Sequence, residues 1–279
     1  MKICRYGDAG FEKPGVIDSN NQLRDLSGIV HDVTPLTLTV ILESLQSEED
    51  ILRLPVVPGS PRLGPPLSTV SKFVAIGLNY RDHALEASLP IPDEPVVFFK
   101  APSCINGPDD DIIIPPHSTK LDWEAELGIV MAQKAKQVSK EDALEHVAGY
   151  CIVNDVSDRG FQFQSSQWDK AKSCDTFGPM GPYIVTRDEV SDPQNLAIWL
   201  EVNGERRQDS HTSQMIFSVA EIVSYVSHYM TLMPGDVIAT GTPAGVGLGM
   251  KPEPVWLREG DTIRIHVEKL GYQNQILKR

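Results

Sequence analysis

Alternation of apolar and polar residues is the strongest pattern in the chain, and it predicts strands. The segment IRIHVEKL, residues 263–270, alternates over its first six residues, as a strand with one buried face does. The segment WLEVNGERRQ, residues 199–208, carries an Asn203-Gly204 pair of the kind that joins two strands in a tight hairpin. A continuous apolar run, KFVAIGL at residues 72–78, is typical of a buried strand.

Helical patterns are fewer and are not regularly interleaved with the strands. An apolar helical stretch runs from Leu36 to Leu45, and a short helix is expected within NYRDHALEA, residues 79–87. Two capping boxes, one at Ser139 before ALEHVAGY and one at Ser218 before IVSYVSHY, predict two further helices. Because strands outnumber helices and do not alternate with them, the pattern favours a β-rich α+β fold over a doubly wound one.

A proline-rich segment divides the chain. Residues 54–67 contain five prolines and two glycines, a composition that suits an extended connector. Before it, KICRY and PGVID, with DSNNQ as turn residues, predict a hairpin. We therefore expect a small N-terminal α+β domain over residues 1–67 and a main domain over residues 68–279.

Composition narrows the class of protein. A net charge of −13, without a basic stripe, argues against a nucleic-acid partner but leaves room for a small anionic substrate. No apolar run approaches the roughly 18 residues of a membrane span, so no membrane partner is expected. The four cysteines are scattered and no apolar signal region begins the chain, which predicts free thiols in the cytoplasm.

Three carboxylates are the strongest chemical signal. Glu124 and Glu126 in LDWEAELGIV are two apart, so a strand would point both to one face. Together with Asp155 in GYCIVNDVSDR they form a set of hard oxygen ligands, which favours Mg²⁺, then Mn²⁺ or Ca²⁺, over zinc. The alternative is that the E-x-E pair belongs to an exposed polar strand face.

His83 and Glu86 in NYRDHALEASLP are three apart, so on a helix they share a face. The carboxylate would then orient the imidazole, and the pair would form a dyad able to activate water. The alternative is an exposed histidine with an incidental acidic neighbour. The stretch LPIPDEP that follows is placed to form a lid over a site.

Cationic and amide side chains follow Asp155 closely. Arg159, Gln162 and Lys172 lie where they could bind a substrate carboxylate or an oxyanion. Alternatively, Arg159 or Lys172 pairs with a nearby acid, namely Asp158, Asp169 or Asp175.

Two further segments carry candidate binding residues. Lys100 ends the apolar run VVFFK, which indicates a site residue or, alternatively, a lysine that snorkels to water. The Gly-rich turn TGTPAGVG, residues 240–247, carries two threonine hydroxyls and can present backbone N–H groups to an anion.

Six segments in order resemble the signatures of the fumarylacetoacetate hydrolase family. They are GLNYRDHALE, EPVVFFKAPS, HSTKLDWEAELGIV, NDVSDRGFQ, KSCDTFGPMGP and PGDVIATGTPAGVG. The resemblance covers roughly Lys72 to the C-terminus. It implies a mixed β-sandwich roll, a homodimer, and a site whose residues fall on His83, Glu86, Glu124, Glu126, Asp155, Arg159, Gln162, Lys172 and Thr242. One departure is the VSDR stretch, where Asp158 would weaken an anion site if its carboxylate turned inward.

The resemblance also implies a class of reaction. Family members act on 2-oxo acids, so the expected activity is hydrolysis of the C–C bond of a 2,4-dioxo acid, an acylpyruvate or a 2,4-dioxo-3-deoxy sugar acid, to pyruvate and a carboxylic acid. In such a reaction His83 with Glu86 would activate water and Lys172 would offset the oxyanion. For a hydroxylated substrate tail, Gln164, Ser165 and Gln167 are candidate contacts. The alternatives are a ureidoglycolate lyase, an oxaloacetate decarboxylase that passes through the same enolate, and a non-catalytic binder of a metal and an oxo acid.

Overall fold

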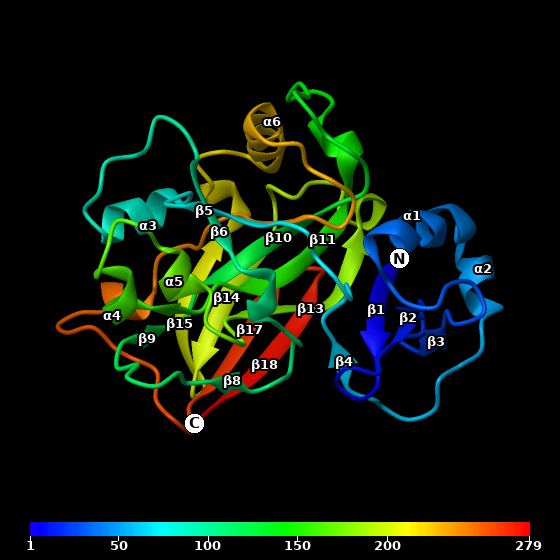
Figure 1. Ribbon diagram of the computed structural model, residues 1–279, viewed down its shortest axis with the longest axis horizontal. Helices are drawn as coiled ribbons and strands as arrows, with labels where there is room; N and C mark the ends of the chain where they lie inside the picture. The colour runs from blue at the N-terminus through cyan, green and yellow to red at the C-terminus, as the bar shows by residue number, and fades with distance from the viewer.

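Two β-sheets of unequal size form the centre of the computed structural model, which describes residues 1–279 (Figure 1). The larger has eleven strands and the smaller has five. The strands of the larger sheet are β1 (Lys2–Tyr6), β2 (Lys13–Ile17), β3 (Leu23–Asp25), β4 (Leu63–Gly64), β5 (Phe73–Gly77), β6 (Val96–Lys100), β7 (Ile105–Asn106), β10 (Ala125–Met131), β11 (Val147–Asn154), β13 (Gly178–Thr186) and β16 (Val237–Ala239).

The smaller sheet packs its apolar face on the larger one. Its strands are β8 (Ile112–Ile113), β14 (Ala197–Val202), β15 (Glu205–His211), β17 (Thr262–Val267) and β18 (Gly271–Lys278), and a separate pair is formed by β9 (Leu121–Asp122) and β12 (Ser157–Asp158). Residues of β14 alternate between partly and fully buried positions, and those of β17 between largely exposed and buried ones, as the period of two predicts. Buried glutamines join the layers: Gln273 donates to the carbonyl of Ile152 at 2.9 Å, and Gln208 accepts from the backbone N–H of Ala125 at 2.9 Å.

Helices are short and lie at the rim of the sheets. They are α1 (Pro35–Ser44), α2 (Glu48–Leu52), α3 (Arg81–Glu86), α4 (Arg159–Gln162), α5 (Asp169–Lys172) and α6 (Val219–Tyr229), with 3₁₀ turns at Pro102–Cys104, Ala143–His146, Arg187–Glu189, Thr212–Gln214 and Gly247–Gly249. In Figure 1, α3, α4 and α5 gather on one side of the main body, away from the N-terminal lobe. None of the helices has the length and apolarity to cross a membrane.

The β-rich α+β prediction is confirmed, and so are most of its parts. The predicted strand at residues 263–270 is β17, and the predicted hairpin is β14–β15, with left-handed φ values at Asn203 and Gly204. The helix predicted over residues 36–45 is α1, and the capping box at Ser218 begins α6.

The helix predicted from the capping box at Ser139 is wrong. The Ser139 hydroxyl does bond the Asp142 carboxylate at 2.7 Å, but only one 3₁₀ turn, Ala143–His146, follows. From Val147 the chain is β11, every residue of which is buried between β10 and β13. Pairing on both sides in the large sheet therefore overrides the local helix-start signal.

The N-terminal segment forms a lobe of its own, at the right in Figure 1. The predicted hairpin is β1–β2, and β3 follows it after a turn at residues 18–22. The proline-rich connector is irregular apart from β4, which pairs with β1, and a single antiparallel bridge between Val56 and Arg24 of β3. The lobe joins the large sheet because β1 pairs with β13, with Lys2 opposite Val185 and Ile3 opposite Ile184. The division of the chain at residue 68 stays a prediction.

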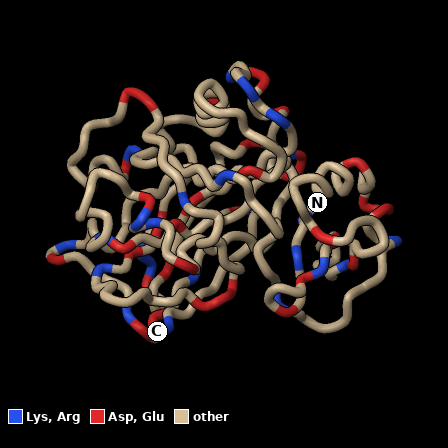
Figure 2. The backbone as a smooth tube through the Cα atoms, in the orientation of Figure 1, with Lys and Arg blue, Asp and Glu red and all other residues tan.

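Charged residues of both signs are interspersed over both lobes (Figure 2). The charged residues that do not lie on the surface are informative. Several charged side chains are almost fully buried in the main body, and they include Lys100, Asp122, Glu124, Glu126, Asp155, Arg159 and Lys172. Buried charges need partners, so these residues define the region where chemistry is expected.

Candidate metal and active site

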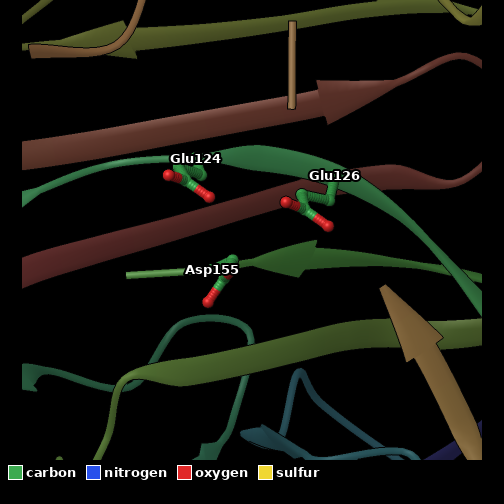
Figure 3. A group of neighbouring side chains, drawn as sticks. All are labelled: Glu124, Glu126 and Asp155. Carbon is green, nitrogen blue, oxygen red and sulfur yellow. The ribbon is translucent and has the colours of Figure 1, made fainter. Parts of the chain in front are cut away.

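Pairing of β10 with β11 brings the three predicted metal ligands together. Ala125 lies opposite Asn154, and one step further the backbone N–H of Asp155 donates to the carbonyl of Glu124 at 2.9 Å. Glu124 directly precedes β10, Glu126 lies on β10 and Asp155 directly follows β11 (Figure 3), and one carboxylate oxygen of each lies within 4.8 Å of the others. Glu124 is 5% exposed and Glu126 is 2% exposed, so the exposed polar face considered as the alternative is wrong.

Glu124 and Glu126 differ in charge environment. Burial alone would raise the pKa of Glu124, but the Lys172 ammonium and the Arg159 guanidinium outweigh it and hold the pKa at about 2. Burial raises the pKa of Glu126 well above its ordinary value, and the Asp155 and Glu124 charges add to the rise. The oxygen-only donor set and the uncompensated charge at Glu126 both fit a divalent cation.

Two lysines hold the acidic cluster. The Lys172 ammonium lies 2.6 Å from Glu124 Oε2 and 2.7 Å from Asp155 Oδ2. The Lys100 ammonium lies 2.7 Å from Asp155 Oδ1 and also donates to the carbonyl of Lys172. Burial alone would lower the pKa of Lys100, but the Asp155 carboxylate holds it above its ordinary value. Lys100 is 1% exposed, so the snorkelling alternative is wrong.

Arg159 faces the carboxylates and does not pair with Asp158. Its Nη2 lies 2.6 Å from Glu124 Oε1, its Nε lies 2.8 Å from Asp122 Oδ2, and its Nη1 donates to Gln162 Oε1 at 2.9 Å. The Asp158 carboxylate turns away, because it accepts from the Ser118 hydroxyl and from the N–H of Phe161, capping α4. The extra acid in the VSDR stretch therefore leaves the guanidinium in place.

The predicted dyad forms on α3. His83 Nδ1 lies 3.0 Å from Glu86 Oε2, and the second oxygen of Glu86 accepts from the N–H of Gly245 at 2.9 Å. With both oxygens engaged, the carboxylate is fixed. If His83 Nδ1 carries the proton toward Glu86, its Nε2 is left as an acceptor. The helix is itself fixed because Asp82 accepts from the N–H of His83 and from the Ser210 hydroxyl.

The Gly-rich turn binds anions, and they are carboxylates of the chain itself. Gly241 donates to Glu126 at 2.8 Å, Gly245 donates to Glu86, and Gly247 donates to Asp122 at 2.6 Å. Gly241 has φ +95°, and a Cβ there would lie 3.0 Å from the carbonyl oxygen of Ile76, so the position requires glycine. The turn thus aligns Glu126, a predicted metal ligand, and Glu86 of the dyad on one piece of backbone.

A cavity of about 420 Å³ opens over these groups. It is lined by nine of the ten predicted site residues: His83, Glu86, Glu124, Glu126, Asp155, Arg159, Gln162, Lys172 and Thr242. The Gln162 amide nitrogen makes no hydrogen bond within the chain and can donate to a ligand. The Thr242 hydroxyl already donates to the carbonyl of Ala125 and accepts from Gln208.

Lys100 and the predicted tail contacts are placed differently from expectation. Lys100 lies behind Asp155 and does not line the cavity, so the geometry supports a role in holding Asp155 and not a contact with substrate. Gln164, Ser165 and Gln167 are exposed and also do not line it. The distal wall is instead largely apolar, and its members include Leu89, Phe98, Phe163, Trp168 and Leu248.

Sequence reasoning missed Asp122 and Trp168. Asp122 is fully buried beside Arg159, and Trp168 lines the cavity with its ring 5.4 Å from that of Phe98. Asp122 stands two residues before Glu124, so the alternation that marks the two glutamates would also have marked it. No local pattern marks Trp168, because its partners come from β6 and from Gly77 on β5.

Comparisons with known proteins give a consistent result. A family profile described as fumarylacetoacetate (FAA) hydrolase C-terminal matches residues 72–277. The chain is 51% identical over 278 residues to 2,4-didehydro-3-deoxy-L-rhamnonate hydrolase of Sphingomonas sp. (strain SKA58), covering 99% of this chain and 95% of that protein.

Solved structures are similar over the whole chain. The fumarylacetoacetate hydrolase of psychrophilic Exiguobacterium antarcticum superposes with a TM-score of 0.89 at 39% identity, covering 100% of this chain and 99% of that one. Maleylpyruvate hydrolase from Sphingobium sp. SYK-6, in complex with manganese(II) ion and pyruvate, has a TM-score of 0.83 at 28% identity, covering 99% and 98%.

Proposed function

The chain belongs to the fumarylacetoacetate hydrolase family, and on that premise we propose that it is a divalent-metal-dependent hydrolase of 2,4-dioxo acids. The proposed reaction cleaves the C3–C4 bond of an acylpyruvate or a 2,4-dioxo-3-deoxy sugar acid and yields pyruvate and a carboxylic acid. The observation that carries the proposal is the meeting of the His83–Glu86 dyad, the three convergent carboxylates and the Lys172 ammonium in one cavity.

The similar proteins support this choice of substrate and metal. The Sphingomonas relative is named for a 2,4-didehydro-3-deoxy sugar acid, which is a 2,4-dioxo acid. The Sphingobium structure holds manganese(II) and pyruvate, and pyruvate is a product of the proposed reaction. We propose Mg²⁺ or Mn²⁺, held by Glu124, Glu126 and Asp155, with Ca²⁺ as a possible substitute.

A divalent cation, when bound, supplies a Lewis acid that polarises the 2-oxo group of the substrate. The chain provides the other charges. Around the site, the buried carboxylates of Asp122, Glu124, Glu126 and Asp155 outnumber the cations of Lys100, Arg159 and Lys172 by one. A bound divalent cation changes this excess of one negative charge into an excess of one positive charge, which suits an anionic substrate.

The dyad performs the proton transfer. Glu86 holds His83 by Nδ1, so Nε2 takes a proton from water, and the resulting hydroxide attacks C4. When the C3–C4 bond breaks, its electron pair passes into the 2-oxo group and forms the enolate of pyruvate. His83 then returns its proton to C3, which gives pyruvate and restores the neutral imidazole. The Lys172 ammonium offsets the negative charge that develops, and the Gln162 amide donates to a substrate oxygen.

Pyruvate release tests the proposal. The substrates are a panel of acylpyruvates, 2,4-dioxo-3-deoxy sugar acids and oxaloacetate, each assayed with Mg²⁺ and with EDTA. The enzymes are the wild type, His83→Ala and a matched control, His31→Ala, which changes an exposed histidine of the N-terminal lobe. We expect release from a dioxo acid that requires metal, is lost in His83→Ala and is retained in His31→Ala.

Other outcomes distinguish the alternatives. Release from oxaloacetate alone, surviving His83→Ala, would establish a decarboxylase, since decarboxylation needs no attacking water. Absence of release from every substrate would refute the hydrolase and favour a ureidoglycolate lyase or a non-catalytic binder of a metal and an oxo acid.

A further inference from the structure

Asp122 is a buried carboxylate that has no part in the reaction proposed above. It is fully buried, it does not line the cavity, and it lies on the short strand β9. Four donors nevertheless point at it. Oδ1 accepts from the N–H groups of Trp123 at 2.8 Å and Gly247 at 2.6 Å, and Oδ2 accepts from Leu248 N–H at 3.1 Å and Arg159 Nε at 2.8 Å.

These bonds link two parts of the site that the chain sequence keeps apart. One is the guanidinium of Arg159, whose Nη2 contacts Glu124. The other is the end of the Gly-rich turn, whose earlier N–H groups hold Glu126 and Glu86. We propose that Asp122 is a positioning residue that fixes Arg159 and the Gly-rich turn from outside the cavity. Through Arg159 it sets the geometry of Glu124, and through the turn it sets the geometry of Glu126 and of the dyad.

The contacts of Arg159 show why a carboxylate is needed at this point. With Nε held by Asp122, the guanidinium offers Glu124 only Nη2, which contacts Oε1 and leaves Oε2 to Lys172. Without Asp122, the planar fork of Arg159 is free to pair with both oxygens of Glu124 and to compete with a cation.

The turn is built around the same carboxylate. A Cβ on Gly247 would lie 2.7 Å from Asp122 Oδ1, so only glycine allows this approach. Asparagine is close in shape to Asp122 but has one carbonyl oxygen, and its NH₂ group would face two of the four donors. Asp122→Asn should therefore release the turn, Arg159, or both.

Asp236 provides a matched control. It is also fully buried, and it also accepts from four donors: the Ser71 hydroxyl, the N–H groups of Lys72 and Met233, and the Lys72 ammonium. It lies before β16, whereas the Gly-rich turn follows β16. Asp236→Asn should weaken the fold in the same way as Asp122→Asn and leave the site unchanged.

Three readouts separate positioning from simple loss of stability. In hydrogen exchange, the amides of Gly247 and Leu248, which donate to Asp122, should exchange at least about tenfold faster in Asp122→Asn, as expected for loss of hydrogen bonds to a charged group. The Kd for Mn²⁺ should rise roughly 10–100-fold, as is typical when a partner of a metal ligand is lost. The turnover of a 2,4-dioxo acid per folded molecule should fall by a similar factor.

Hydrogen exchange is independent of the proposed function, whereas the Mn²⁺ affinity and the turnover rest on it. A wild type that binds no Mn²⁺ would refute the metal centre, while exchange in the turn would still decide the role of Asp122. Unchanged exchange in folded Asp122→Asn, or equal changes in Asp236→Asn, would overturn the proposal. If Asp122→Asn does not fold, Arg159→Lys tests the same link, because lysine cannot bridge two carboxylates as a planar fork does. An Arg159→Lys variant that binds Mn²⁺ as tightly as the wild type would then overturn the proposal.

Discussion

Glu126→Gln should stabilise the metal-free protein at neutral pH while it abolishes metal binding. Glu126 accepts one hydrogen bond, from Gly241, and forms no ion pair, unlike Glu124 and Asp155. Its pKa is raised well above the ordinary 4.5 by burial and by the two neighbouring carboxylates. Glutamine keeps the shape and the acceptor for Gly241 but carries no charge, so it removes the cost of the buried anion.

The sign and size of the effect follow from proton linkage. A carboxyl group with a raised pKa in the folded state stabilises the fold at pH values below the unfolded pKa, and this contribution is lost as the pH rises toward the folded pKa. Between the two pKa values the slope is up to about 1.4 kcal/mol per pH unit. From pH 5.5 to 7.5 the metal-free wild type should lose up to about 3 kcal/mol relative to Glu126→Gln, which corresponds to roughly 5–10 °C in Tm.

Thermal unfolding in EDTA at pH 5.5, 6.5 and 7.5 measures this difference. The control is Glu145→Gln, which removes one exposed charge and should follow the wild type. Added Mn²⁺ should raise the Tm of the wild type at pH 7.5 and leave that of Glu126→Gln unchanged. A variant whose Tm runs parallel to the wild type across this pH range in EDTA would show that Glu126 is not the uncompensated charge.

Three further predictions concern the site and the assembly. Lys172→Met should lower kcat about 100–1000-fold because the charge that offsets the oxyanion is lost. The control, Lys170→Met, changes an exposed neighbour and should retain the kcat of the wild type. Equal kcat values in the two variants would exclude a role of Lys172 in stabilising the oxyanion. Trp168→Ala should raise KM for substrates with a long tail about 2–10-fold and leave the Mn²⁺ affinity unchanged. An unchanged KM would show that Trp168 does not contact the substrate tail. Sedimentation equilibrium should give twice the chain mass for the expected homodimer, and a single chain mass would contradict it.

Residues close in sequence were the ones that local patterns predicted best. The His83–Glu86 contact needs only one helical turn, and the convergence of Glu124 with Glu126 needs only the alternation of a strand. The strands and the Asn203-Gly204 hairpin were predictable for the same reason.

Contacts between distant segments could not be read from local patterns. The position of Lys100 behind Asp155 depends on packing of β6 against the segment that carries Lys172, and nothing near Lys100 in sequence indicates it. The Gly-rich turn was recognised as an anion binder, but its partners were identified only by the fold. The capping box at Ser139 shows the opposite failure, since a correct local bond was overruled by the sheet.

Pairing of β1 with β13 gives the N-terminal lobe a protective role. The side of β13 that faces away from β11 is covered by β7 at its start and by β1 at its end, where the N–H of Thr186 also donates to the carbonyl of Met1. Without the lobe, residues 184–186 would become an open sheet edge, able to add a strand from another molecule and to seed aggregation. The lobe therefore keeps this edge of the sheet from pairing with another molecule, although it contributes no side chain to the cavity.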